Sequence, residues 1–339
     1  LFSTVSFTSS NVSGSTADGM VKNLNFVDCD VELTIKDTNS AGQAGNEVGV
    51  GLLAGVTANN DGSVSGVYRN VTMDGCKVAG AKNVGGLLGS SGYCSRAKAT
   101  TSTSEIIEKA RMASPVKLYD CSYTNMDVTG GCNVGGYVGK VGMYSGCGIW
   151  ETGKNPEAVA SDSNVKATGA DGLAVCVGGI FGWTQWNISV NTEPEKNAVK
   201  TSGVATIANV AVESPSPNQG LSGAGGFVGR ADYGKNSIYN LSITATEDKR
   251  YIGSSADDSS KLNNVGGCIG YIISGNGSSY WFDSCTFSGL HIAAKGSYTG
   301  GLIGNFTSND PVSCNNITVY GLKFDSQCAG GLFGLVDRA

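Results

Sequence analysis

The sequence predicts an all-β protein: a right-handed parallel β-helix (β-solenoid) of about eight coils, with long loop insertions and one short inserted helix. Three observations lead to this fold class. A glycine-framed apolar hexapeptide recurs along the chain, a second motif of alternating apolar residues precedes its copies, and the distance between copies varies.

The hexapeptide is seen most clearly in Val84-Gly85-Gly86-Leu87-Leu88-Gly89. We expect each copy to form a short strand whose glycines mark tight corners or a closely approaching backbone. Eight copies, the first of them degenerate, occupy residues 50–55, 84–89, 134–139, 177–182, 224–229, 265–270, 299–304 and 329–334.

The second motif begins with an asparagine slot and continues with apolar residues at alternating positions, as in the copy that starts at Asn70. Alternation predicts a strand with one buried face, and the interruption at Asp74-Gly75 predicts a bend between two short strands. We therefore expect two shared inward positions. The first holds Val71, Cys121, Cys285 and Ile317, and the second holds Cys76, Met126, Leu290 and Leu322.

The asparagine slot also predicts a structural feature. A buried amide without a partner costs ~1–3 kcal/mol, so these side chains should bond to the backbone or to each other. We expect the following residues to stack at one corner of the fold: Asn23, Asn70, Asn164, Asn209, Asn240 and Asn316.

The spacing of the repeats favours a stacked array over a layered globular fold. Successive slots lie 31 to 50 residues apart, which an array tolerates because insertions bulge outward. One insertion carries a capping box at Ser102 and Glu105, so we expect a short helix over residues 105–112. We expect residues 1–339 to form a single array that is a segment of a longer chain.

Composition excludes several partners. The formal net charge is −5, so the chain has no basic field for nucleic acid. No apolar run reaches the ~18 residues of a membrane span, so we expect no membrane insertion of this segment.

The Gly-Leu-apolar-Gly core of the copies at Gly86, Gly301 and Gly331 resembles the GLUG-motif repeat family. Other copies depart from it at the leucine, where Tyr137, Ile180, Phe227 and Cys268 stand. The resemblance covers most of the chain as an array. It implies a β-rich module of large surface or secreted proteins, and it transfers no catalytic residue.

The residues give little support to catalysis. The chain has one histidine, His291, whereas a His-Glu-x-x-His zinc site needs two. His291 lies between apolar slots, so we expect it to face solvent. The one Asp-Asp pair, Asp257 and Asp258, is in a loop and is expected to be solvated. We therefore expect no catalytic residue, no metal site and no cofactor.

Four tryptophans, Trp150, Trp183, Trp186 and Trp281, fall outside the repeat slots. We favour the interpretation that they cover coil edges and loops. The alternative is that exposed rings stack on sugars, for which Trp183 and Trp186 are the candidates.

The cysteines divide by position. Those in the inward slots and Cys268 are expected to behave as small apolar residues. Cys94 and Cys147 lie in loops after consecutive hexapeptides, and we expect any disulfide to join these two, with Cys29 and Cys76 as the second choice.

Seven Asn-x-Ser/Thr sequons occur. Three of them, at Asn70, Asn240 and Asn316, occupy the asparagine slot, where stacking is the preferred explanation. Asn11, Asn187 and Asn276 are the better candidates for N-glycosylation, which requires a eukaryotic secretory route.

These features favour a non-catalytic structural or adhesive segment of an extracellular or cell-surface protein. The alternatives are a carbohydrate-binding module and a polysaccharide lyase or hydrolase that uses Asp257 and Asp258. Neither end of the sequence resembles a polar cap. We therefore expect the ends to be covered by more of the same chain or by end-to-end self-association into a filament. A surface glycan or a host or cell-surface protein is the other expected partner.

Overall fold

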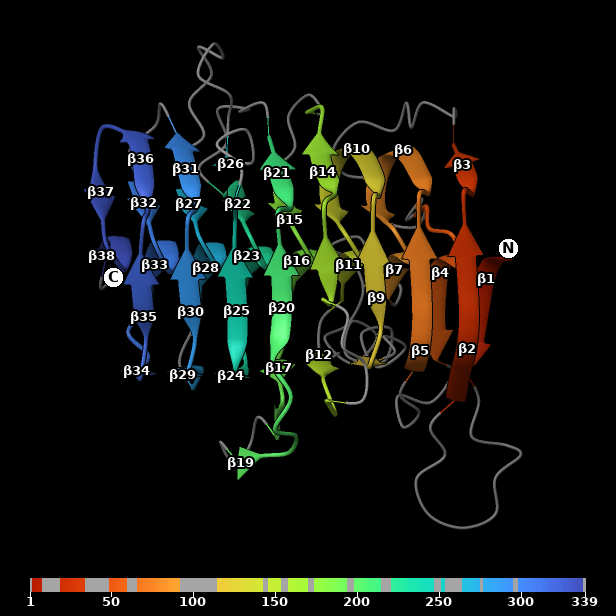
Figure 1. Cartoon of the computed structure of the whole chain (residues 1–339), viewed down its shortest axis with the longest axis horizontal. Coiled ribbons are helices and arrows are strands. Elements are labelled where there is room, and N and C mark those ends of the chain that lie inside the picture. The colour runs from red at the N-terminus through yellow and green to blue at the C-terminus, as the bar shows by residue number, and fades with distance from the viewer. Residues whose placement is uncertain are drawn as a thin grey trace, which may run out of the picture.

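The computed structural model describes residues 2–7, 19–33, 49–59, 66–91, 115–142, 146–153, 158–169, 174–193, 198–214, 221–246, 251–253, 264–274, 277–294 and 298–337. These residues form three large parallel β-sheets, which we call sheets A, B and C. The chain passes through the sheets in the repeated order B, C, A as it advances along the long axis (Figure 1).

Sheet A has nine strands in chain order. They are β1 (Phe2–Phe7), β4 (Ala54–Asn59), β7 (Leu88–Ser91), β11 (Val138–Val141), β16 (Phe181–Thr184), β23 (Val228–Ala231), β28 (Ile269–Ile273), β33 (Ile303–Thr307) and β38 (Phe333–Asp337).

Sheet B has fourteen strands, because from its third level onward a bend splits the segment at each level into two strands. They are β2 (Gly19–Val27), β5 (Gly66–Asp74), β8 (Val116–Tyr119), β9 (Ser122–Thr124), β12 (Cys147–Trp150), β13 (Ala160–Ser161), β17 (Ile188–Val190), β20 (Ala205–Ala208), β24 (Lys235–Tyr239), β25 (Leu241–Thr244), β29 (Ser279–Asp283), β30 (Thr286–Ser288), β34 (Val312–Asn315) and β35 (Thr318–Tyr320).

Sheet C has thirteen strands. They are β3 (Asp30–Glu32), β6 (Lys77–Gly85), β10 (Asp127–Gly135), β14 (Asn164–Ala167), β15 (Cys176–Gly178), β21 (Ala211–Glu213), β22 (Gly223–Gly225), β26 (Tyr251–Gly253), β27 (Asn264–Gly266), β31 (His291–Ala294), β32 (Tyr298–Gly300), β36 (Lys323–Ser326) and β37 (Ala329–Gly330). Two short strands, β18 (Thr192–Glu193) and β19 (Ala198–Val199), pair antiparallel in an insertion.

The structure corrects the predicted fold class. The chain is all-β, but it forms three separate large parallel sheets and not one β-helix of about eight coils, and the smallest sheet already has nine strands. The physical reason is that the bends within each repeat are sharp enough to end one sheet and begin another. The described residues contain no helix, and the expected helix over 105–112 lies outside them.

The glycines of the hexapeptide form the sharp corner between sheets C and A. A methyl group on Gly85 would fall on the carbonyl oxygens of Leu88 and Tyr137, and one on Gly136 would fall on that of Gly179. Only glycine leaves room for the backbones to approach this closely. The predicted role of these glycines is therefore confirmed.

The two predicted inward positions are also confirmed. Val71, Cys121 and Cys285 are buried in one core cluster, as are Cys76, Met126 and Leu290. Ile317 and Leu322 occupy the same positions in the last level of strands and pack against that cluster, but they are only partly buried.

The prediction that six asparagines share one corner is only partly correct. Four of them, Asn23, Asn70, Asn240 and Asn316, lie at the bend of sheet B with φ from 50° to 54°, a left-handed conformation that asparagine tolerates. Asn70 Nδ2 donates to Asn23 Oδ1 at 2.9 Å. Asn209 lies at the bend between sheets B and C, and Asn164 lies within β14.

Candidate functional site

A pocket of about 200 Å³ lies where the chain crosses from sheet A to sheet B. Three consecutive crossings line it: the one from β16 to β17, the one from β23 to β24, and the one from β28 to β29. Because parallel strands stack ~4.8 Å apart, these crossings present their side chains side by side along the long axis.

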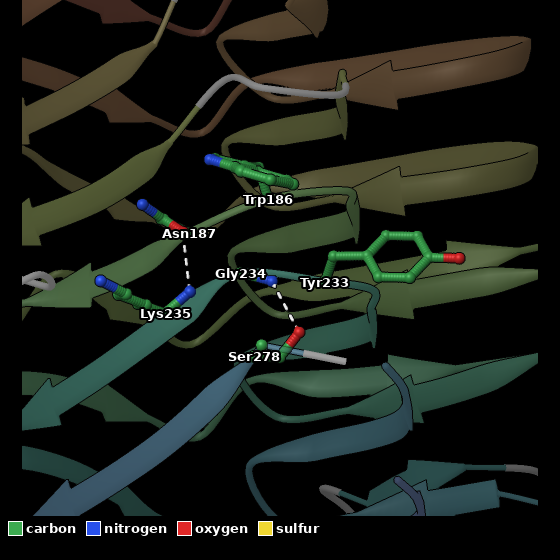
Figure 2. A pocket seen from close by; sticks show the side chains of 7 residues that line it. Trp186, Asn187, Tyr233, Gly234, Lys235 and Ser278 are labelled. Carbon is green, nitrogen blue, oxygen red and sulfur yellow. Dashed lines mark hydrogen bonds between the residues drawn. The ribbon is translucent and has the colours of Figure 1, made fainter. Parts of the chain in front are cut away.

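Two aromatic rings and several polar groups line this pocket (Figure 2). Trp186 is partly buried, whereas Tyr233 is 42% exposed. In Figure 2 the Tyr233 ring and the Lys235 side chain extend in opposite directions from the crossing that carries both residues. The pocket therefore combines apolar ring surface with one cation.

Hydrogen bonds between neighbouring crossings hold the pocket floor. The Lys235 backbone N–H donates to Asn187 Oδ1 at 2.7 Å, and the Gly234 N–H donates to Ser278 Oγ at 3.1 Å. Gly234 has a φ of 107°, and a side chain there would meet Asn187. These hydrogen bonds fix the shape of the pocket floor in the absence of a ligand.

Trp183, the second predicted sugar-stacking residue, lies outside this pocket. It stands between Lys140 and Arg230 in sheet A, with the two cations 4.6 and 4.9 Å from its ring centroid. Its Nε1 donates to Asp232 Oδ2 at 2.9 Å. Burial raises the pKa of Asp232, an effect that the adjacent Arg230 opposes. Protein cations therefore already lie over the ring of this indole, and sugar stacking by Trp183 and Trp186 stays a prediction.

The other two tryptophans stack on tyrosines. The Trp150 and Tyr119 rings are 5.0 Å apart and nearly parallel, and Trp281 lies against Tyr239 at 6.5 Å. Trp150 belongs to β12 and Trp281 to β29, so these two tryptophans lie in strands of sheet B and not in loops.

A buried acid lies next to this stack. Glu151 is 3% exposed, and burial together with the nearby Asp120 raises its pKa from 4.5 to about 8. Asp120 is held by the backbone N–H and hydroxyl of Thr152 at 2.7 and 3.0 Å. The two carboxyl groups therefore differ in environment. Among the described residues Glu151 Oε1 has no hydrogen-bond partner, and burying it unpaired is unfavourable.

The cysteines of the described residues are free thiols. Cys147 is buried on β12, and Cys94 lies outside the described residues, so their disulfide stays a prediction. Cys29 and Cys76 are adjacent at the bends between sheets B and C, where the Cys29 N–H donates to Cys76 Sγ at 3.3 Å.

Several other predicted residues are placed as follows. Asn11, Asn276, Asp257 and Asp258 lie outside the described residues. Asn187 is a partly buried pocket residue, and its glycosylation stays a prediction. His291 does not simply face solvent, since its Nε2 lies 2.6 Å from Asp325 Oδ2 and its ring contacts Tyr251.

Within the part of the chain that the structure describes, each sheet ends in strands that pair on one side only. At one end β1, β2 and β3 pair with β4, β5 and β6, and at the other end β38, β35 and β36 pair with β33, β30 and β31 (Figure 1). Such edges present unpaired N–H and C=O groups to a further strand. Val27 at one end and Tyr320 at the other are both 60% exposed.

Sequence reasoning missed Tyr233 and Lys235 as pocket residues. The only signal was positional, because both follow a hexapeptide at about the distance at which Trp186 follows its own.

No group of three or more His, Cys, Asp or Glu side chains in the described part of the chain is placed to hold a metal ion. The described part also lacks any helix with the length and apolarity that a membrane crossing requires.

No family model, curated protein or solved structure matches this chain. Neither the structure nor these comparisons support the expected GLUG-repeat family, adhesive role or extracellular location. What the chain does therefore has to be argued from its own geometry.

Proposed function

We propose that this chain is a structural, non-catalytic module that associates end to end with a second copy of itself. The single observation that supports the proposal is the match between its two ends. Among the described residues the outermost strands of each sheet pair on one side only, and all paired strands of a sheet are parallel, so a second copy can extend the three sheets in the same direction.

The residues that would meet are apolar where the core continues. The strand pairings, followed from each strand to the next, show which residues occupy the same position at the two ends of a sheet. Phe26 and Val319 occupy the same position of sheet B at opposite ends, as do Val27 and Tyr320. Val27 and Tyr320 are each 60% exposed, and covering both removes apolar surface from water.

Charges in sheet C favour the same arrangement. Asp30 and Lys323 share one position of the sheet at opposite ends, so a second copy brings an acid against a base. Two residues farther along, Glu32 would lie against Asp325, and two like charges repel each other. The contact between Asp325 and His291 weakens this repulsion. A contact of this head-to-tail kind does not close on itself and propagates.

The test uses charge reversal at these exposed positions, with light scattering as a function of protein concentration. Asp30→Lys or Lys323→Asp alone places like charges in contact and should weaken association about fivefold to tenfold. The double variant restores an opposite pair and should recover association. Glu32→Lys should strengthen association, because it replaces a repulsive pair by an attractive one.

Two controls separate this contact from general charge effects. Lys235→Asp reverses an exposed charge in β24, which has a neighbouring strand on both sides and lies away from both ends of sheet B, so it should not reduce association. The proposal is wrong if the parent chain stays monomeric at millimolar concentration, or if the double variant associates no better than the single ones.

A further inference from the structure

We propose that Cys29 and Cys76 are a site of reversible oxidation, at which a disulfide fastens the first level of strands to the second. The oxidant is a low-molecular-weight disulfide such as oxidised glutathione. This inference is independent of end-to-end association, because it concerns two residues of the same chain.

The strand pairing places the two cysteines at the same position of neighbouring levels. Asp30 of β3 pairs with Lys77 of β6, and each cysteine immediately precedes one of these residues (Figure 1). Neighbouring parallel strands lie ~4.8 Å apart, and a disulfide usually joins Cα atoms that are ~4.4–6.8 Å apart. The two backbones therefore lie at a distance that a disulfide spans.

Backbone hydrogen bonds on both sides of the cysteines hold this register. The Asp28 N–H donates to the Asp74 carbonyl oxygen at 2.9 Å, and the Lys77 N–H donates to that of Cys29 at 2.8 Å. Between these two bonds, the Cys29 N–H donates to Cys76 Sγ at 3.3 Å. The Cys76 sulfur thus already lies against the residue to which it would be linked.

The two thiol groups also interact with each other. Burial raises the pKa of Cys76, and a hydrogen bond with the Cys29 side chain raises it further. Each thiol also donates to the carbonyl oxygen two residues before it, at 3.4 Å for Val27 and 3.2 Å for Asp74. A thiol is a weak donor, so the side-chain rotation that forms the disulfide gives up little.

Access and pairing favour this site over the other thiols. Cys29 is partly exposed and can be reached by an oxidant, whereas Cys76 is buried directly behind it. Among the described residues, no other two cysteines occupy the same position of neighbouring strands. The partly buried Cys314, for example, lies opposite Phe282.

Thiol–disulfide exchange balances the reaction. The Cys29 thiolate attacks one sulfur of oxidised glutathione, which forms a mixed disulfide and releases one glutathione thiolate. The Cys76 thiolate then attacks Cys29 Sγ, so that the protein disulfide forms and the second glutathione leaves. Two electrons pass from the protein thiols to glutathione, and the two protons that the cysteines lose end on the released glutathione thiols.

The link has a structural consequence at this end of the sheets. Among the described residues β3 pairs with β6 alone, and β2 pairs with β5 alone. Terminal strands of this kind open more often than strands that have two neighbours. A covalent bond between the bend after β2 and the bend after β5 restrains that opening, and it also restricts the unfolded chain.

The experiment treats the full chain with oxidised glutathione, blocks the remaining thiols with iodoacetamide and maps the peptides by mass spectrometry. Cys29 and Cys76 should both lose their thiols and appear as one linked pair of peptides, which dithiothreitol separates. Hydrogen exchange of the amides in β2 and β3 should slow at least about fivefold on oxidation.

Two variants serve as controls. Cys29→Ser keeps the size of the side chain and should leave Cys76 as a thiol, with no change in exchange on treatment with the oxidant. Cys314→Ser removes another partly buried thiol and should leave the link intact. The proposal is overturned if Cys29 stays reduced, keeps a bound glutathione or joins a cysteine other than Cys76. A link that leaves the exchange of β2 and β3 unchanged would show that it does not fasten the first level.

Discussion

Asn133 donates a hydrogen bond through its Nδ2 to Oδ1 of Asn83 at 2.9 Å, although the two residues are 50 positions apart. Both are buried and have left-handed backbones, with φ values of 49° and 47°. They lie within β6 and β10 of sheet C, just before the hexapeptides. This amide pair lies outside the asparagine slots of the repeat, and it joins two neighbouring strands of sheet C through their side chains.

The pair predicts a specific order of stability. Asn133→Ala loses the buried hydrogen bond, at ~1–3 kcal/mol, and forces alanine into a left-handed conformation, at ~1–2 kcal/mol more. Asn133→Gly loses only the hydrogen bond, because glycine adopts this conformation readily. Urea unfolding should therefore rank the alanine variant about 1 kcal/mol below the glycine variant. Equal stabilities would show that the backbone conformation is not strained by a side chain.

Glu151 predicts that stability falls as the pH rises. Its pKa is about 8 in the fold and near 4.5 when unperturbed. Between these values the native state holds a proton that the unfolded state has released, so deprotonation favours unfolding. The free energy of unfolding should drop by up to about 4 kcal/mol from pH 4.5 to pH 8 on account of this group, with no further loss above pH 8.

Glu151→Gln isolates this contribution, because glutamine keeps the shape and cannot ionise. Urea unfolding of both proteins from pH 5 to pH 9 should show their difference growing in favour of glutamine up to about pH 8. A constant difference over this range would mean that Glu151 is already ionised in the native state.

Gly136 and Gly331 are the same position of two hexapeptides and form a matched pair. A methyl group at Gly136 would fall on the Gly179 carbonyl oxygen and the Tyr123 ring, whereas nothing lies within 4 Å of one at Gly331. Gly136→Ala should cost more than about 3 kcal/mol, since the obstacle includes backbone. Gly331→Ala should change the midpoint of thermal unfolding little. If both variants lose similar stability, the cost comes from the restricted backbone conformation of alanine and not from a clash with neighbouring atoms.

Leu290 and Leu322 share one inward position, just before the adjacent strands β31 and β36, but Leu290 is 4% exposed and Leu322 is only partly buried. Leu290→Ala should cost ~2–5 kcal/mol as a core truncation. In the isolated chain Leu322→Ala should cost less than half as much. If a second copy covers Leu322, its cost should rise with protein concentration while that of Leu290 stays constant.

The sequence by itself determined the local pattern. Alternating apolar residues specify strands with one buried face, so the inward positions of Val71, Cys76, Met126 and Cys285 could be predicted correctly. The glycines of the hexapeptide also indicated close backbone contacts. These features could be predicted because they depend on neighbours within one repeat and on a register that every repeat shares.

Only the tertiary structure decided how the strands divide into sheets and which side chains meet. The bend angles depend on left-handed residues such as Asn23 and on backbone contacts such as that of Gly136 with Gly179, which involve residues about 45 positions apart. The pocket has the same origin. Trp186, Tyr233 and Ser278 come from three repeats of unequal length, and they become neighbours because insertions leave the stacking of parallel strands unchanged. The pattern of residues within one repeat does not show which residues of other repeats will lie next to it in space.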